Sequence, residues 1–242
     1  MIELKGLTKQ FKEIKAVDSL SFNVKKGEIL GLLGENGAGK TTTLRLLATM
    51  LKPTSGTAII DGCDLVKDSN LVRSKIGILF GGETGLYDRL TAYENIAYFG
   101  ELNGMNKTEI KNRVDKLAKL LDMEEYINRR VGKFSKGMKQ KVAIARSIVH
   151  NPEIMFLDEP TSGLDVSAVK VVHDFIIELK KEGKTIVFSS HSMKEVEKLC
   201  ERVAIIHKGK LQVQDSLINL KEKYPENDLE EIFLKKVGGN NE

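Results

Sequence analysis

Near its start the chain reads Gly34-Glu35-Asn36-Gly37-Ala38-Gly39-Lys40-Thr41-Thr42, a stretch that fits the pattern G-x-x-x-x-G-K-T. A short apolar run of strand length, residues 28–33, comes before it, and residues 43–48 carry the apolar spacing of a helix. A glycine-rich loop between a strand and a helix points successive N–H groups at one anion, and the N-terminus of the helix adds its positive end. The sequence therefore predicts a nucleotide-binding phosphate loop.

Two side chains of this loop have expected roles toward a nucleoside triphosphate. Lys40 would reach the β- and γ-phosphates, and the Thr41 hydroxyl would be a ligand of Mg²⁺. The alternative is an ordinary glycine-rich turn with a surface lysine. The flanking strand and helix favour the nucleotide site.

A second motif, which contains two acidic residues, is expected at the same site. Four apolar residues, 154–157, are followed directly by Asp158 and Glu159. A buried strand that ends in two acids delivers its carboxylates to the carboxyl edge of the sheet, where the phosphate loop also opens. We expect Asp158 to hold Mg²⁺ through its water shell and Glu159 to polarise the attacking water. An acidic turn after a strand is the alternative.

Composition limits the classes of partner. The chain has 242 residues, with 41% hydrophobic and 30% charged residues and a formal net charge of +4. This basic excess is weak, and no Lys/Arg run is interleaved with aromatic residues, so we expect no nucleic-acid partner. Cys63 and Cys200 lack the spacing of a zinc site. We also expect no signal sequence and no membrane-spanning run, so that any work at a membrane needs another chain to span it.

The order of apolar segments predicts the fold class. Residues 76–80, 154–157, 185–188 and 203–206 read as strands that alternate with helices, which indicates an α/β fold with a mostly parallel central sheet covered on both faces. Before the phosphate loop, residues 2–5 and 20–24 alternate as strands do, and Phe11 lies between them in a loop-like stretch. From about Leu86 to His150 strands give way to helices.

Several helix starts are marked by capping residues. Asn106 with Glu109, and Ser192 with Glu195, have the spacing of capping boxes. Asp165 precedes a further amphipathic helix. Ser135 precedes another helix in the stretch Phe134-Ser135-Lys136-Gly137-Met138, where a small Gly137 permits close approach. A helix N-terminus behind Ser and Gly can bind an anion, and a capped helix without a ligand is the alternative.

Taken together, the motifs identify the chain as similar to the ATP-binding subunits of ABC transporters. The motifs that carry the resemblance occur in the family's order over essentially the whole chain: Gly34–Thr42, Ser135–Gly137, Asp158-Glu159, Ser162–Asp165 and His191. The resemblance implies ATP and Mg²⁺ as cofactors and a head-to-tail homodimer that forms with ATP. In such a dimer Ser135 and Gly137 would meet the γ-phosphate bound by the partner's phosphate loop.

The resemblance also implies three residue roles that the residues alone do not establish. Phe11 would stack on adenine, Asp165 would carry contacts across the dimer, and His191 would hydrogen-bond the γ-phosphate. It further implies a single ABC ATPase domain over residues 1–242. Its core would be formed by residues 1–85 and 151–220, its helical subdomain by 86–150 and its C-terminal helical tail by 221–242.

The chain departs from the family pattern in two places. The usual signature is Leu-Ser-Gly-Gly-Gln, of which Ser135 and Gly137 remain. A glutamine usually follows the strand at residues 76–80, and Gly81-Gly82-Glu83 stands here instead, so we consider Glu83 a replacement ligand for Mg²⁺, with a solvated Glu83 as the alternative. The loop at residues 80–91, together with Phe134–Met138, resembles the ATPases of bacterial sodium-extruding ABC transporters.

The expected function is therefore ATP hydrolysis that powers export, with sodium as the first candidate cargo and a drug or antibiotic as the second. The protein would sit at the cytoplasmic face of the membrane, bound to an integral membrane permease. A stand-alone ABC ATPase in DNA repair or translation is a rival, but such proteins usually carry two ATPase units or large inserts. A P-loop GTPase or kinase would lack Ser135–Gly137 and the His191 loop.

Overall fold

The computed structural model describes residues 1–80, 85–224 and 228–238. Its core is a six-stranded sheet with the strand order β11-β10-β4-β9-β8-β7. Five of these strands are parallel neighbours, and β11 pairs antiparallel with β10 at one edge. The strands are β4 (Ile29–Leu33), β7 (Ile76–Phe80), β8 (Ile154–Asp158), β9 (Thr185–Ser190), β10 (Arg202–His207) and β11 (Lys210–Ser216). The predicted mostly parallel sheet is confirmed.

A second, antiparallel sheet lies beside it and is built from the N-terminal part of the chain. Its strand order is β2-β1-β5-β6, with β3 paired to β1. The strands are β1 (Ile2–Phe11), β2 (Ile14–Leu20), β3 (Asn23–Val24), β5 (Ser55–Ile60) and β6 (Cys63–Asp64). The sequence-based bounds were wrong here: β1 runs on to Phe11, which pairs with Ile14, and residues 20–24 are not one strand. Pairing along β2 keeps β1 extended beyond its clearly alternating residues.

The central strands are apolar throughout because both faces of the sheet are covered. In β4, Leu30 and Leu32 pack toward α1 (Lys40–Leu47) and the N-terminal sheet, while Ile29 and Leu33 join the core on the other face. That second core includes α6 (Val166–Lys181), α7 (Met193–Leu199) and α9 (Leu229–Gly238), with α8 (Leu217–Lys223) beside them. Two-sided burial explains a continuous apolar run where a half-exposed strand would alternate.

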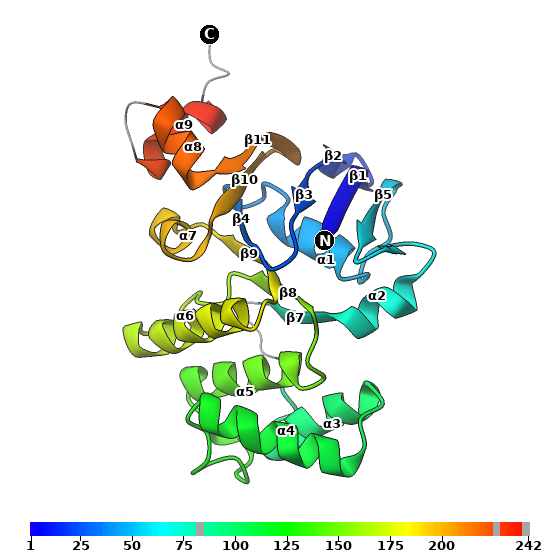
Figure 1. The fold of residues 1–242 in the computed structure, drawn as a ribbon, viewed down its shortest axis with the longest axis vertical. Helices are drawn as coiled ribbons and strands as arrows, with labels where there is room; N and C mark the ends of the chain where they lie inside the picture. Colours follow the sequence, from blue (N-terminus) through cyan, green and yellow to red (C-terminus); the bar gives the residue numbers. More distant parts are fainter. Residues whose placement is uncertain (81–84, 225–227, 239–242) are drawn as a thin grey trace.

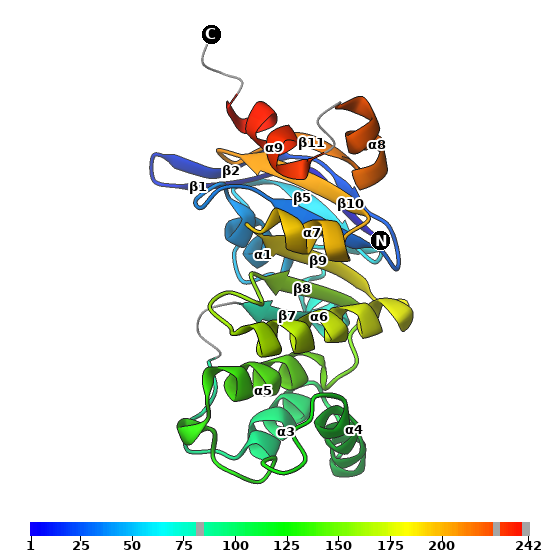
Figure 2. The ribbon, with the colours of Figure 1, turned by 90° about the vertical axis from the view of Figure 1, so that its left-hand side faces the viewer.

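The helical region forms one end of the molecule. It contains α3 (Ala92–Leu102), α4 (Lys107–Leu120), a short 3₁₀ turn at Val131–Lys133 and α5 (Lys136–Ile148), with α2 (Ser69–Lys75) on the core side. Figure 1 shows α3, α4 and α5 gathered at one end and α8 and α9 at the other, and the turned view in Figure 2 shows the same separation. The expected run of helices after Leu86 is confirmed among the described residues, where only an isolated bridge, Thr91 to Arg130, interrupts it.

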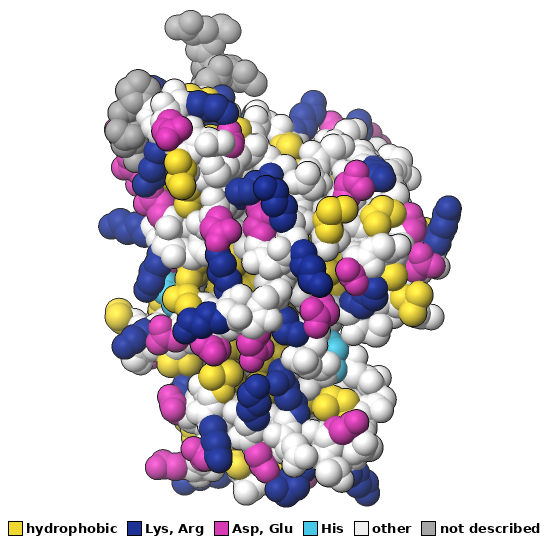
Figure 3. Space-filling view, in the orientation of Figure 1, with side chains coloured by type: hydrophobic (Ala, Val, Ile, Leu, Met, Phe, Trp, Pro, Cys, Tyr) yellow, Lys and Arg dark blue, Asp and Glu magenta, His cyan; other side chains and the backbone are white. Residues whose placement is uncertain are grey.

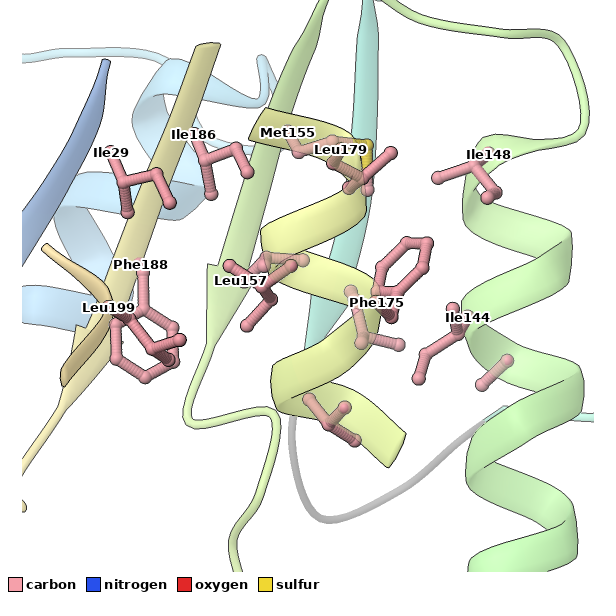
Figure 4. Packing of buried hydrophobic residues seen from close by; sticks show 14 of the residues in the cluster. Ile29, Ile144, Ile148, Met155, Leu157, Phe175, Leu179, Ile186, Phe188 and Leu199 are labelled. Atoms are coloured by element: carbon pink, nitrogen blue, oxygen red, sulfur yellow. The ribbon is translucent and has the colours of Figure 1, made fainter. Parts of the chain in front are cut away.

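Packing joins this helical end to the sheet through α6. In Figure 4, Phe175 and Leu179 of α6 lie between Leu157 and Met155 of β8 and the isoleucines of α5, Ile144 and Ile148. All of these side chains are buried. One continuous apolar core therefore connects the helix that Ser135 begins with the strand that ends in Asp158.

The surface is charged with both signs, and Figure 3 shows lysine and arginine interspersed with aspartate and glutamate on the face it draws. Among the described residues, no helix combines the length and hydrophobicity needed to cross a bilayer.

A phosphate-loop site with a carboxylate and a histidine

The phosphate loop joins β4 to α1, as the sequence predicts, and two of its positions require glycine. Gly39 has φ of +107°, and a Cβ there would lie 2.4 Å from the Ala16 carbonyl oxygen. A Cβ at Gly34 would lie 2.5 Å from the carbonyl oxygen of Ile206. Neighbouring backbone thus closes tightly around the loop, and only residues without a side chain fit at these positions.

The loop encloses a small polar cavity of about 140 Å³. Six predicted cofactor-binding residues line it together with Ala16, Glu35 and Glu159; they are Asn36, Gly37, Gly39, Lys40, Thr41 and Thr42. Gly34 and Ala38 belong to the frame behind it: Ala38 is buried, and its carbonyl accepts a hydrogen bond of 2.9 Å from Gly209 N–H. The structure therefore brings most of the predicted loop residues to one concave site at the start of a helix.

Lys40 places a positive charge inside this loop. Its side chain is only 5% exposed, and its ammonium donates to the carbonyl oxygens of Gly34 at 2.7 Å and Glu35 at 3.2 Å. The same nitrogen lies 3.7 Å from Oε1 of Glu159. A cation fixed in this way by backbone carbonyls, beside a ring of glycines, suits a ligand that carries several negative charges.

Glu159 lies between two basic side chains. Its Oε1 faces Lys40, and its Oε2 lies 3.3 Å from Nδ1 of His191, whose side chain is 60% exposed. The backbone of Glu159 has φ of +45°, a conformation uncommon for a residue with a Cβ. Its N–H donates to the Ser189 carbonyl at 3.1 Å and to the Ser189 hydroxyl at 3.0 Å. The two predicted catalytic residues, Glu159 and His191, are therefore in contact.

Asp158 is a buried carboxylate that fits a metal. It is 7% exposed, and its Oδ1 accepts a hydrogen bond of 2.5 Å from the Ser189 hydroxyl. Within residues 1–80, 85–224 and 228–238, no lysine, arginine or histidine forms an ion pair with it. A buried acid without a cationic partner needs a compensating charge, and carboxylate and hydroxyl oxygens are the donor chemistry that Mg²⁺ prefers. Asp158 and Thr41 are the residues that would hold the ion.

The signature residues lie at the start of α5 and not in the cavity of the phosphate loop. Ser135 caps this helix, as predicted, by accepting a hydrogen bond of 3.2 Å from Met138 N–H, and it remains exposed. A Cβ at Gly137 would lie 3.4 Å from Cβ of Ala168. This is van der Waals contact, so packing within one chain does not require glycine at this position, and the capped end of the helix is exposed at Ser135.

Asp165 and Phe11 are also outside that cavity. Asp165 caps α6 by accepting from Ala168 N–H at 2.9 Å, and hydrogen bonds from the Ser167 hydroxyl and from Ala168 lower the pKa of its carboxyl. Phe11 ends β1 with 44% of its surface exposed, and the ammonium of Lys9 lies 5.1 Å from its ring centroid. Glu83, considered as a metal ligand, lies outside the described residues.

Sequence reasoning missed several polar residues around the site. Ser189 and Ser190 follow the apolar residues 186–188 of β9, and each directs its hydroxyl to an acid. Gln140 is buried in α5 and donates to the Pro160 carbonyl at 2.8 Å. The sequence did indicate a role for the serines, because two hydroxyls at the end of a buried strand require hydrogen-bond partners. For Gln140, a polar residue on the apolar side of α5 was the available signal.

Comparison with known proteins agrees with this geometry. A sequence model of the ABC transporter family matches residues 17–162. The ABC transporter ATP-binding protein NatA of Bacillus subtilis (strain 168) is 50% identical over 241 residues, which cover 98% of each protein. The bacitracin transport ATP-binding protein BcrA of Bacillus licheniformis is 42% identical over 224 residues, which cover 92% of this chain and 72% of BcrA.

A solved structure shows the same fold. It is the dimeric, post-hydrolysis state of an ATP-binding cassette bound to ADP and Pi, and it matches with a TM-score of 0.80 and 30% identity over 89% of this chain and 98% of that one. The family model matches well over half of this chain. The phosphate loop, with a carboxylate and a histidine beside it, agrees with that match. This chain belongs to the ABC transporter family and is one of its ATP-binding, ATP-hydrolysing subunits.

Proposed function

We propose that this chain is the ATPase that powers export of sodium ions through a separate integral membrane permease, from the cytoplasmic face of the membrane. The observation that carries the proposal is the 50% identity to NatA along essentially the whole of both chains. The sequence features at residues 80–91 and 134–138, which resemble sodium-extruding ATPases, support the same cargo.

ATP and Mg²⁺ would bind at the phosphate loop, with Lys40, Thr41 and Asp158 as the residues that hold them. Lys40 would neutralise the β- and γ-phosphates, and Mg²⁺ would add charge on the remaining phosphate oxygens. Glu159 would orient and polarise the attacking water, and His191 would donate to the γ-phosphate. Phe11, exposed at the end of β1, would offer its ring to adenine.

The proposal includes a homodimer that closes on ATP. Ser135 and Asp165 begin their helices at exposed positions, and neither lines the cavity of the phosphate loop in the same chain. The capped N-terminus of α5 is a hydrogen-bond donor for an anion that a second copy would supply. A dimeric arrangement in a cassette of the same fold supports this reading. Closure and reopening of the dimer would then move the permease.

A cellular experiment tests the cargo. We expect that deleting this gene together with the gene of its permease lowers growth at high sodium, above all at alkaline pH, and raises cell sodium. Wild-type protein supplied with the permease should restore tolerance, and the hydrolysis-deficient Glu159→Gln variant should not. Export of a peptide antibiotic is the second candidate, because BcrA is also similar. Unchanged sodium tolerance with a loss of bacitracin resistance would favour that candidate.

A further inference from the structure

Behind the site lies a half-buried polar cluster that the roles described above do not use. We call it the Glu195 cluster, formed by Glu195 of α7, Ser190 of β9, His173 of α6 and Thr161. The Ser190 hydroxyl donates to Oε2 of Glu195 at 2.7 Å, and Nε2 of His173 lies 3.0 Å from Oε1. A hydrogen bond from the Thr161 side chain is among the causes that lower the pKa of the Glu195 carboxyl. Hydrogen bonds at 2.7 and 3.0 Å thus join this carboxylate to β9 and α6, and Thr161 adds a third segment.

The hydrogen positions in the cluster follow from its partners. The ammonium of Lys198 lies 3.4 Å from Nδ1 of His173 and can only donate, so this ring nitrogen accepts. Nε2 of His173 therefore carries the hydrogen and donates to Glu195. Burial raises the pKa of Glu195, but the hydrogen bonds from Thr161, Ser190 and His173 outweigh it and leave the pKa below its ordinary value. Glu195 is ionised, and only 13% of its side chain is exposed.

Each of the three donors leads directly to a functional segment. Ser190 immediately precedes His191, and Thr161 follows Glu159 by two residues. His173 lies on α6, the helix that Asp165 caps. Figure 1 places α7, which carries Glu195, beside the central sheet, and α7 packs against both α6 and β9. The carboxylate of Glu195 therefore ties together the segments that present the catalytic glutamate, the histidine and the exposed Asp165.

Helix capping does not explain this side chain. Ser192 and Glu195 have the spacing of a capping box, but the structure corrects that expectation. Ser192 accepts from Glu195 N–H at 3.4 Å, whereas the Glu195 carboxylate turns inward to the cluster. A capping carboxylate would stay at the surface of the helix end. Placing a charge in a half-buried site is costly unless it is fully hydrogen-bonded, as it is here.

We propose that Glu195 is a positioning residue for ATP hydrolysis, which holds the Glu159–Thr161 segment and His191 in a fixed relative geometry so that both side chains act on one γ-phosphate. Glu159 and His191 come from different strand ends, and their 3.3 Å contact involves a side chain that is mostly exposed. The N–H of Glu159 ties its backbone to Ser189 of β9, and the Glu195 cluster adds a second polar link from behind, through Ser190 and Thr161.

Steady-state ATPase kinetics of the full chain test this proposal. Small misplacements of reacting groups lower the rate of chemistry by up to about 100-fold without weakening substrate binding. We expect Glu195→Ala to lower kcat by about 10–100-fold, with KM for ATP within about twofold of the wild type. Glu195→Gln keeps the volume and an acceptor for Ser190 but loses the charge. Its kcat should therefore lie between that of the wild type and that of Glu195→Ala.

Two comparisons separate positioning from a purely structural role. Glu197→Gln is the matched control, because Glu197 lies on the same helix and forms an ion pair with Lys221 at 2.8 Å, away from the cluster; its kcat should equal that of the wild type. In a double-mutant cycle, Glu195→Ala added to His191→Ala should cost less than it does alone, because the residue it positions is already missing.

Ser190→Ala provides a second variant if Glu195→Ala does not fold. It removes a single hydroxyl and leaves the strand intact, and we expect a smaller fall in kcat in the same direction. The proposal is overturned if Glu195→Gln and Ser190→Ala lower the melting temperature but keep the wild-type kcat. Fully additive losses with His191→Ala would also overturn it.

Discussion

At the scale of single residues, the site is organised around the carboxylate of Glu159. It lies within 4 Å of both Lys40 and His191, one of which is buried and the other exposed. Its own backbone is held in a left-handed conformation by its N–H, which donates to both the carbonyl and the hydroxyl oxygen of Ser189. Strained backbone that neighbouring groups enforce is frequent where a side chain has to be aimed. Here it turns the carboxylate of a residue at the strand end toward the phosphate loop.

Replacing Glu159 separates binding from turnover. We expect Glu159→Gln to retain ATP binding and to lower ATP turnover by about 10²–10⁴-fold, because an amide of the same size cannot act as a general base. Phosphate release measures turnover, and size-exclusion chromatography with ATP and Mg²⁺ should show a stable dimer. Glu153→Gln is the control, since Glu153 precedes β8 at its other end and pairs with Lys184. A variant that remains monomeric with bound ATP would contradict the proposed homodimer.

At the scale of the elements, the N-terminus of α5 combines two functions in one residue. Ser135 caps the helix through Met138 N–H and stays exposed, where a second copy could bring a phosphate. Substitutions can separate the two functions, because aspartate is as good an N-cap as serine but carries a negative charge.

Ser135→Ala should therefore lower stability, whereas Ser135→Asp should keep stability and lose activity. We expect Ser135→Ala to cost about 1 kcal/mol of stability and to lower the melting temperature by about 2–4 °C. Ser135→Asp should keep the wild-type melting temperature and lose ATPase activity, because its charge repels the γ-phosphate. Thermal unfolding and phosphate release provide both readouts. Full activity in the aspartate variant would mean that this helix end meets no phosphate.

At the scale of the whole molecule, His150 joins the helical end to the central sheet. It lies just beyond α5, and its Nε2 is 3.0 Å from the Ile76 carbonyl at the start of β7. A carbonyl only accepts, so Nε2 donates to it, and this bond by itself raises the pKa of His150. Burial is the main cause that lowers the pKa of His150, and the nearby Arg113 acts in the same direction.

The sign of the resulting pH dependence follows from linkage. The pKa of His150 is about 6.5 in the unfolded chain and lower in the folded protein. As the pH falls from about 6.5 toward the folded pKa, the unfolded chain therefore binds more protons than the folded protein, and the free energy of unfolding falls. We expect His150→Gln, whose amide can still donate to Ile76, to lack this component. Denaturant unfolding of both proteins measures it, and at about pH 8 their difference should be constant. A difference that does not change between about pH 8 and 5 would contradict the assignment.

Local chemistry in the sequence was enough for the phosphate loop, the parallel strands and the helix caps. Gly34–Thr42 specifies its own turn, because glycine, lysine and threonine act over neighbouring residues. Apolar runs such as residues 154–157 specify burial on both faces, and Asn106 with Glu109 forms the capping box that its spacing predicts. Each of these features depends on residues a few positions apart, and a sequence displays them directly.

Tertiary packing settled the features that depend on distant partners. β11 became a strand because β10 offered it an edge, although its residues are largely half-exposed. Glu195 matched a capping box by spacing, but His173, 22 positions away, and Ser190 drew its carboxylate inward. Ser135 and Asp165 cap their helices at exposed ends, apart from the phosphate loop of their own chain. Which of several competing partners a polar side chain bonds to depends on burial and distance, and both are fixed only when the sheet and helices have packed.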